Sequence, residues 1–157
     1  MERAVRLNLI FSVVPRYEGK WRGPNKMYQK RLGKMYTKTN PLKSLIDHNV
    51  IVCGGTDSDT TEINYFLAIH DAINHPTQTE RISLIEALKL FTTASAYAIN
   101  KENIIGKLSP GTLADVIVLG YHFLSQSLHC INPGYKFRDF VFQKSLIYFY
   151  NVILCLF

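Results

Sequence analysis

One short segment, VIVCGGTDSDTTEINYF at residues 50–66, constrains the fold of this 157-residue chain more than any other. Its apolar, β-branched start is typical of a buried strand, which runs through Gly54 and Gly55 to Thr56 and Asp57. A strand that delivers a carboxylate at its carboxyl end is typical of an α/β barrel, where catalytic residues follow the strands. We therefore expect an α/β fold, with Asp57 as the first candidate functional residue.

Helices and strands are expected to alternate around this segment. Residues 9–14 form a short buried strand, and residues 17–39, rich in glycine and charge, are predicted to be mostly loop. Asn40 is expected to cap a helix that has Pro41 in its first turn, and this helix leads into the strand at residues 50–53.

Two further helices are predicted after the aspartate. A helix at residues 62–74 would cover the strand with one apolar face, formed by Ile63, Phe66, Leu67, His70 and Ile73. Ser83 and Glu86 have the spacing of a capping box. The apolar stripe behind this box consists of Leu84, Ala87, Leu88, Phe91 and Ala94. Farther on, an alternating strand is predicted at residues 114–119.

Six segments stand in a fixed order along the chain. They are LIFSVVP (9–15), RLG (31–33), NPLKSLID (40–47), GGTD (54–57), SLIEALKLFTTASA (83–96) and GKLSPGTLAD (106–115). In order and spacing they resemble the amidohydrolase superfamily, in particular its amidohydrolase 3 branch of metal-dependent hydrolases.

The resemblance implies an α/β architecture in three parts. Residues 1–104 would be the carboxy-terminal part of a TIM barrel, namely strands 7 and 8 with their flanking helices. Residues 105–120 would supply a strand of the small β-sandwich domain, and residues 121–157 would be a divergent apolar tail. A complete barrel takes about 250 residues. We therefore expect a fragment of a larger enzyme, from a split gene, a truncated sequence or a decayed copy.

The resemblance also assigns roles to two residues. Asp57 matches the aspartate that ligates a divalent metal, zinc or a similar ion, and accepts a proton from the attacking water. Two alternatives stay open: Asp57 caps the following helix, or Asp59 contributes to the site instead. Arg31 matches a patch that builds substrate contacts, and its alternative is a rim arginine in a salt bridge.

Other candidates match no family ligand. The chain contains no His-x-His segment, and its five histidines are expected to be packed or surface residues. Asp115 lies in a Pro-Gly turn and is expected to be structural.

The implied activity is hydrolysis of a carbon–nitrogen bond, other than a peptide bond, in a small amide or cyclic amide. The fragment alone is expected to be inactive. The alternative is a catalytically inactive half-barrel, either a pseudoenzyme or a partner of the missing N-terminal half.

Composition argues against several other classes. The net charge of +6 comes with no nucleic-acid-binding motif, so no nucleic-acid partner is expected. Three cysteines without a CxxC spacing argue against a disulfide framework and a zinc ribbon. With no signal peptide recognised, these features favour the cytoplasm. The last apolar run, residues 145–157, is shorter than the roughly 20 residues that span a bilayer, so no transmembrane segment is expected.

Overall fold

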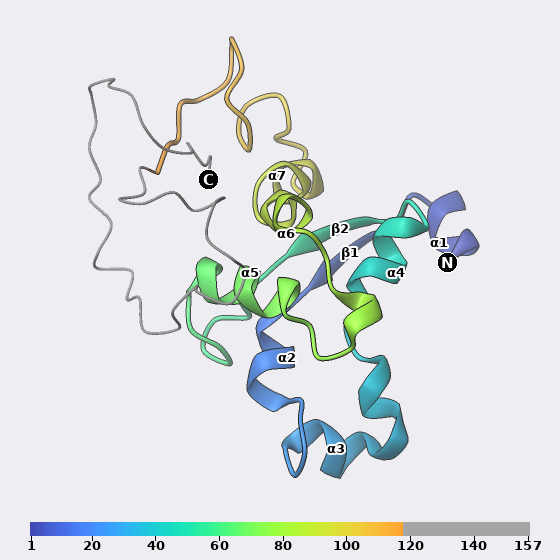
Figure 1. The fold of residues 1–157 in the computed structure, drawn as a ribbon. Helices are drawn as coiled ribbons and strands as arrows, with labels where there is room; N and C mark the ends of the chain where they lie inside the picture. The colour runs from blue at the N-terminus through green and yellow to red at the C-terminus, as the bar shows by residue number, and fades with distance from the viewer. Residues whose placement is uncertain (118–157) are drawn as a thin grey trace.

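The computed structural model describes residues 1–117, in which helices and strands alternate (Figure 1). The elements are α1 (Glu2–Arg6), β1 (Ile10–Val13), α2 (Arg16–Trp21), α3 (Met27–Leu32), η1 (Gly33–Lys38), α4 (Leu42–Asp47), β2 (Ile51–Gly54), α5 (Tyr65–Ile73), η2 (Gln78–Glu80), α6 (Leu84–Leu90) and α7 (Thr93–Ala98). The predicted mixed α/β structure is confirmed.

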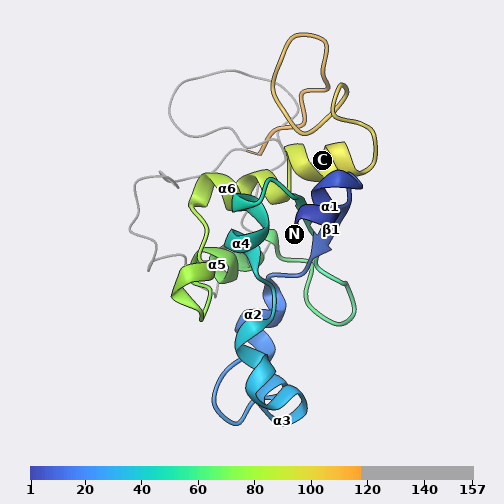
Figure 2. The ribbon, with the colours of Figure 1, turned by 90° about the vertical axis from the view of Figure 1, so that its right-hand side faces the viewer.

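The two strands form a parallel sheet. Ile10 lies opposite Ile51 and Val13 lies opposite Gly54. One further bond, from the Gly55 amide to the Val13 carbonyl at 2.8 Å, extends the pairing beyond the strands. Parallel strands run in the same direction, so their carboxyl ends meet at one edge of the sheet. This edge is where α2 follows β1 and where the Asp57 loop follows β2 (Figure 2).

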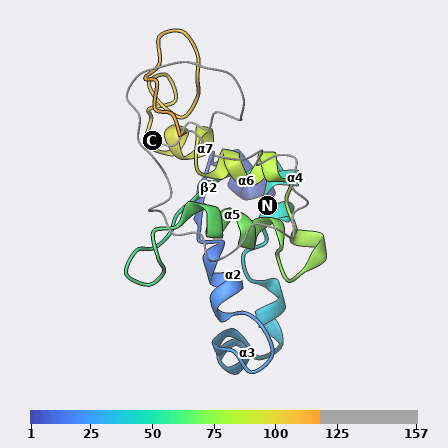
Figure 3. The same cartoon turned by 60° about the vertical axis from the view of Figure 1, so that its left-hand side comes forward.

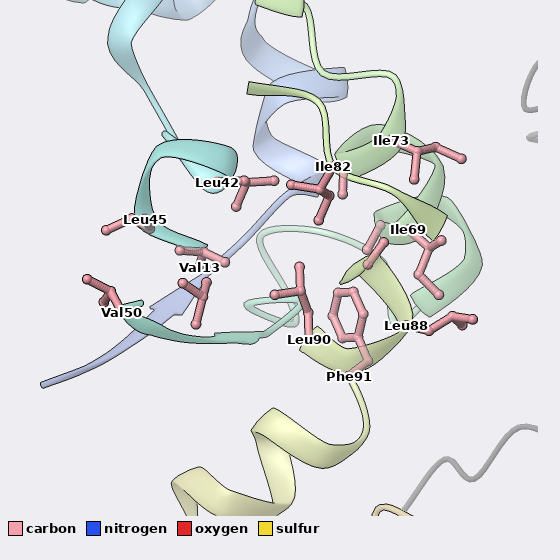
Figure 4. Packing of buried hydrophobic residues seen from close by; sticks show 14 of the residues in the cluster. Val13, Leu42, Leu45, Val50, Ile69, Ile73, Ile82, Leu88, Leu90 and Phe91 are labelled. Atoms are coloured by element: carbon pink, nitrogen blue, oxygen red, sulfur yellow. The ribbon is translucent and has the colours of Figure 1, made fainter. Parts of the chain in front are cut away.

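One hydrophobic core joins this sheet to α4, α5 and α6 (Figure 4). Val13 and Val52 contribute from the strands, while Leu42, Ile69 and Phe91 contribute from the helical side and are fully buried. The helices therefore cover one face of the sheet through a single packed cluster.

The prediction that residues 17–39 are mostly loop is wrong. The structure contains α2, α3 and η1 there, and they project from the sheet (Figures 1 and 3). The glycines lie where one helix ends and the next begins: Gly23, between α2 and α3, has a φ angle of 138°, and Gly33, after α3, has a φ angle of 54°. These conformations suit a residue without a Cβ atom.

Asn40 does not cap α4 as predicted. The cap position is Pro41, which makes no side-chain capping bond. The side-chain amide of Asn40 instead donates a hydrogen bond from Nδ2 to the Glu18 carboxylate at 2.9 Å. A buried carboxylate is a strong acceptor, which explains why the amide turns away from the helix end.

The helix predicted at residues 62–74 is present as α5, and its predicted face is correct in part, since Ile73 is buried and Phe66 packs against the core. Asn64 caps α5 by accepting a hydrogen bond from the Leu67 amide at 3.0 Å. The helix therefore starts later than predicted, and Ile63, outside it, is exposed. Its buried residues are Ala68, Ile69, Asp71, Ala72 and Ile73.

The capping box of α6 is confirmed. The Glu86 amide donates to Ser83 Oγ at 3.2 Å, and the Ser83 amide donates to Glu86 Oε2 at 2.7 Å. Leu88 and Phe91 from the predicted stripe are buried. The strand predicted at residues 114–119 extends beyond the described residues and stays a prediction, while the tail lies wholly outside them.

Gly54 of β2 lies directly against the ring of Phe91, the residue at the end of α6. A Cβ atom built there would lie 2.4 Å from Cε1 of the Phe91 ring. At Gly55 the nearest atom to a built Cβ is Ser12 Oγ, at 3.8 Å. Only the first glycine is therefore required by packing.

We predict that Gly54→Ala destabilises the chain by about 1–3 kcal/mol, because Phe91 is fully buried and has little room to move. Gly55→Ala is the matched control and should change the free energy of unfolding by less than about 1 kcal/mol. Urea unfolding followed by circular dichroism measures both. Equal losses for the two variants would contradict this account of Gly54.

Candidate functional site

Asp57 lies in a tight turn just beyond β2. Its carbonyl oxygen accepts hydrogen bonds from the Thr60 amide at 2.9 Å and the Thr61 amide at 3.1 Å. Its φ angle is 50°, in the left-handed region that aspartate and asparagine tolerate better than other residues with a Cβ atom. The turn leaves the Asp57 side chain exposed at the edge where both strands end.

The capping alternative for Asp57 is wrong, because α5 is capped by Asn64. Asp59, the other aspartate of the turn, also has a positive φ angle, of 76°, and its side chain is exposed. The structure therefore keeps both carboxylates out of the helix and in the turn.

Tyr17 connects α2 to this turn. Its hydroxyl donates a hydrogen bond to Asp57 Oδ2. This bond raises the pKa of Tyr17 above 10.0, and burial and the nearby carboxylate charge act in the same direction. The ring of Tyr17 packs on Trp21 with centroids 4.3 Å apart, and Trp21 lies 6.0 Å from the ring of Tyr28.

A second contact from α2 reaches the same turn. Lys20 Nζ donates to the Thr60 carbonyl oxygen at 2.7 Å. Beside this contact is an open pocket of about 310 Å³, lined by Lys20, Ser58, Asp59, Thr60, Thr61, Glu62 and Ile63. Cationic, acidic and hydroxyl groups thus surround a space next to Asp57.

A buried ion pair holds the start of α2 against α5. Arg16 Nη1 lies 2.9 Å from Asp71 Oδ2, and the Asp71 side chain is only 8% exposed. Burial raises the pKa of Asp71, and Arg16 opposes that rise. The two helices are close here, since a Cβ atom built at Gly19 would lie 2.3 Å from Asp71 Oδ2.

A second buried cluster surrounds Glu18. Its Oε2 accepts from Arg22 Nη1 at 2.9 Å and lies 3.5 Å from His75 Nε2, while Oε1 accepts from Asn40. Arg22 also donates to the Thr37 carbonyl at 3.1 Å. The buried carboxylate therefore has partners for both oxygens, which offsets part of the cost of burying its charge.

The structure places Arg31 apart from Asp57. Arg31 lies in α3, at the far end of the projecting segment, with α2 between it and the sheet (Figure 1). Its side chain is exposed and makes no ion pair with any residue in the range 1–117. Its substrate-binding role stays a prediction.

The described histidines lie in three different settings. His48 contacts the Ser44 carbonyl at 2.7 Å, His70 lies beside Asp71, and His75 is fully buried in the Glu18 cluster. Within residues 1–117, no group of three or more His, Cys, Asp or Glu side chains could hold a metal ion. Asp57 can supply one ligand of a metal site but not a complete set.

Tyr17, Lys20, Glu18 and Arg22 were missed by the sequence analysis, because their segment was expected to be loop. The spacing of Glu18 and Arg22, four positions apart, is typical of a helical ion pair and was the available signal. Nothing local in the sequence indicates that Tyr17 contacts Asp57.

No helix in the described part of the chain is long and apolar enough to cross a membrane.

Comparison with known proteins gives concordant matches. The family model described as "Amidohydrolase family" matches residues 1–126. The chain is 35% identical over 100 residues to "Putative amidohydrolase YtcJ" of Bacillus subtilis strain 168, covering 57% of this chain and 19% of that protein. It spans about a fifth of that relative's length.

One solved structure also resembles the chain. It is the crystal structure of an uncharacterized metal-dependent hydrolase from Pyrococcus furiosus, with a TM-score of 0.59 and 25% sequence identity. The match covers 71% of this chain and 23% of that one.

We predict that Arg22→Met destabilises the chain by about 3–5 kcal/mol, because it leaves the Glu18 carboxylate buried without its cation. Arg31→Met is the matched control on an exposed site and should stay within about 0.5 kcal/mol of the wild type. Urea unfolding of both variants measures the difference. A small effect of Arg22→Met would contradict this account of the buried Glu18 cluster.

A pH dependence follows from His75. Burial is the main cause that lowers its pKa from 6.5, and Arg22 adds to it, while Glu18 and the hydrogen bond to Thr77 oppose it. As the pH falls below about 6.5, the unfolded chain takes up the proton first, so stability is lost. We expect the unfolding midpoint to decrease from pH 7 to pH 5, and to decrease less in His75→Gln. An unchanged loss in that variant would contradict the assignment.

Proposed function

The chain belongs to the amidohydrolase family, and from this premise we propose that it forms the carboxy-terminal part of a metal-dependent hydrolase. In this proposal β1 and β2 are the seventh and eighth strands of a TIM barrel, and residues 105–120 belong to a small β-sandwich domain. The remaining strands and metal ligands would come from the rest of the barrel.

The position of Asp57 is the observation that carries the proposal. Catalytic residues of such barrels lie beyond the carboxyl ends of parallel strands. Asp57 follows β2 at that edge, with an exposed carboxylate, and its turn is held by contacts from the element that follows the neighbouring strand.

Asp57 fits a role as one ligand of a divalent metal, zinc in our proposal. Such a metal, when bound, supplies a Lewis acid and lowers the pKa of a water molecule from 15.7 toward about 7. Tyr17 engages Oδ2 of the carboxylate, which leaves Oδ1 for a ligand. In this proposal the same carboxylate accepts a proton from the attacking water.

The proposed substrate is a small molecule with a carbon–nitrogen bond other than a peptide bond, such as an amide or a cyclic amide. Family membership supports this class. Arg31 is proposed as a residue of the substrate-binding rim, because its segment follows β1 at the edge where Asp57 lies. The cysteine pattern supports a cytoplasmic location for the enzyme.

One observation favours a second function, that of a catalytically inactive half-barrel acting as a pseudoenzyme or partner subunit. The described residues offer no complete set of metal ligands. Under this alternative the chain retains the fold of the family without its chemistry.

The test uses the 157-residue chain alone and mixed with the N-terminal barrel segment of YtcJ. Bound zinc is measured by mass spectrometry, and hydrolysis is measured on a panel of amides and cyclic amides. We expect zinc and turnover only in the mixture, and a loss of turnover of about 10²–10⁴-fold in Asp57→Asn, because that variant removes both a ligand and a base.

Asp59→Asn is the matched control in the same turn and should retain most of the activity. Absence of zinc and turnover from every mixture would favour the inactive half-barrel. An equal loss in Asp59→Asn would contradict the assignment of Asp57.

A further inference from the structure

We propose that Tyr17 is a positioning residue for Asp57. Its hydroxyl orients the carboxylate so that Oδ1 faces a bound metal ion. This inference rests on the proposed function of Asp57. It concerns a residue of α2, which reaches the site only because β1 and β2 end at the same edge of the sheet.

The contact itself limits the freedom of the carboxylate. The Tyr17 hydroxyl donates to Oδ2 of an exposed side chain that would otherwise sample several rotamers. A hydrogen bond from a hydroxyl to a carboxylate is charge-assisted and stronger than one between neutral groups. One oxygen is therefore engaged, while the other is presented in a defined direction.

Tyr17 can orient Asp57 because its own ring is held in place. It packs on Trp21 with centroids 4.3 Å apart and an interplanar angle of 34°. The ring of Tyr28 also lies 6.0 Å from that of Trp21, and Lys20 Nζ lies 5.6 Å from the Trp21 ring. This aromatic row restricts movement of the phenol.

The backbone that carries Tyr17 is fixed on both sides. The residue before it, Arg16, pairs with Asp71 at 2.9 Å, and the residue after it, Glu18, pairs with Arg22 at 2.9 Å. Both carboxylates are buried. Removing one partner of a buried ion pair leaves the other charge unpaired, which is strongly destabilising. The two pairs therefore hold α2 firmly at the position of Tyr17.

Lys20 holds the same turn at a second point. It donates to the Thr60 carbonyl, and the Thr60 amide in turn donates to the Asp57 carbonyl. The turn is thus attached to α2 through both the Asp57 side chain and the Thr60 backbone. Loss of Tyr17 alone should therefore free the carboxylate without releasing the turn.

The first measurement is the nuclear magnetic resonance of the full chain labelled with ¹³C at aspartate Cγ. The chain has six aspartates, and the Asp57 signal is the one lost in Asp57→Asn. We expect Tyr17→Phe to shift this signal and to leave those of the other aspartates in place. Tyr28→Phe is the matched control, since Tyr28 also packs on Trp21, whereas the hydrogen bond to the Asp57 carboxylate comes from Tyr17.

The inference is overturned if Tyr17→Phe leaves the Asp57 signal unchanged, or if Tyr28→Phe shifts it equally. A tyrosine that only packs on Trp21 would give one of these results. The same contact can be observed from the other partner, with ¹³C at tyrosine Cζ and the variant Asp57→Asn, which should shift the Tyr17 signal. The inference therefore stays testable if Tyr17→Phe does not fold. In that experiment, an unmoved Tyr17 signal overturns it.

The second measurement titrates Mn²⁺, a paramagnetic divalent cation, into the same labelled chain. If Asp57 binds a metal, its signal broadens first, and Tyr17→Phe should need about tenfold more Mn²⁺ for equal broadening, because bonds to a ligand tune its affinity by about 10–100-fold. Equal broadening in Tyr17→Phe would overturn the positioning role. No broadening in the wild type would count against the proposed metal role of Asp57, while the shift measurement still decides whether Tyr17 orients it.

Discussion

The parallel pairing of β1 with β2 is the constraint on which the rest of the structure depends. Because the strands share one direction, the segments that follow them leave the sheet at the same edge. This brings α2 against the turn that carries Asp57, although the two are far apart in sequence. The contacts of Tyr17 and Lys20 with that turn, and the pocket beside the Lys20 contact, all follow from this pairing. An antiparallel arrangement would place the two segments at opposite edges.

Buried carboxylates help to attach the projecting segment, which contains α2, α3 and η1, to the rest of the fold. Residues 19–46 contain eight lysines and arginines and no aspartate or glutamate, so this stretch has no acid of its own to pair with them. The carboxylates that pair with this stretch lie outside it: Glu18 pairs with Arg22, and Asp47 and Glu86 pair with Lys43. Just before the stretch, Arg16 pairs with Asp71 from α5. Arg22 of one pair also lies 5.9 Å from the ring of Tyr36. Its position therefore depends on α5 as much as on its own helices.

The features that the sequence predicted correctly have local signals. The strands are apolar runs that end at Val13 and at Gly54, although the first was predicted to be buried and all of its residues except Val13 are exposed. The α6 cap needs only two residues three positions apart. The features that were missed depend on partners far along the chain: Arg16 and Asp71 are 55 positions apart. The start of α5 was predicted too early, because Asn64 caps that helix. The position of Asp57 beyond β2 was predictable from the strand end, but its contact with Tyr17 was not.

The close contact of Gly54 with Phe91 also bears on how the family varies. The ring occupies the volume that a side chain on the strand would need, so each residue sets the size permitted for the other. In related chains a larger residue at the first position should be accompanied by a smaller one at the second. Paired substitution at two such positions is a record of spatial contact. It would allow the face of this strand that meets the helices to be identified in distant sequences from their variation alone.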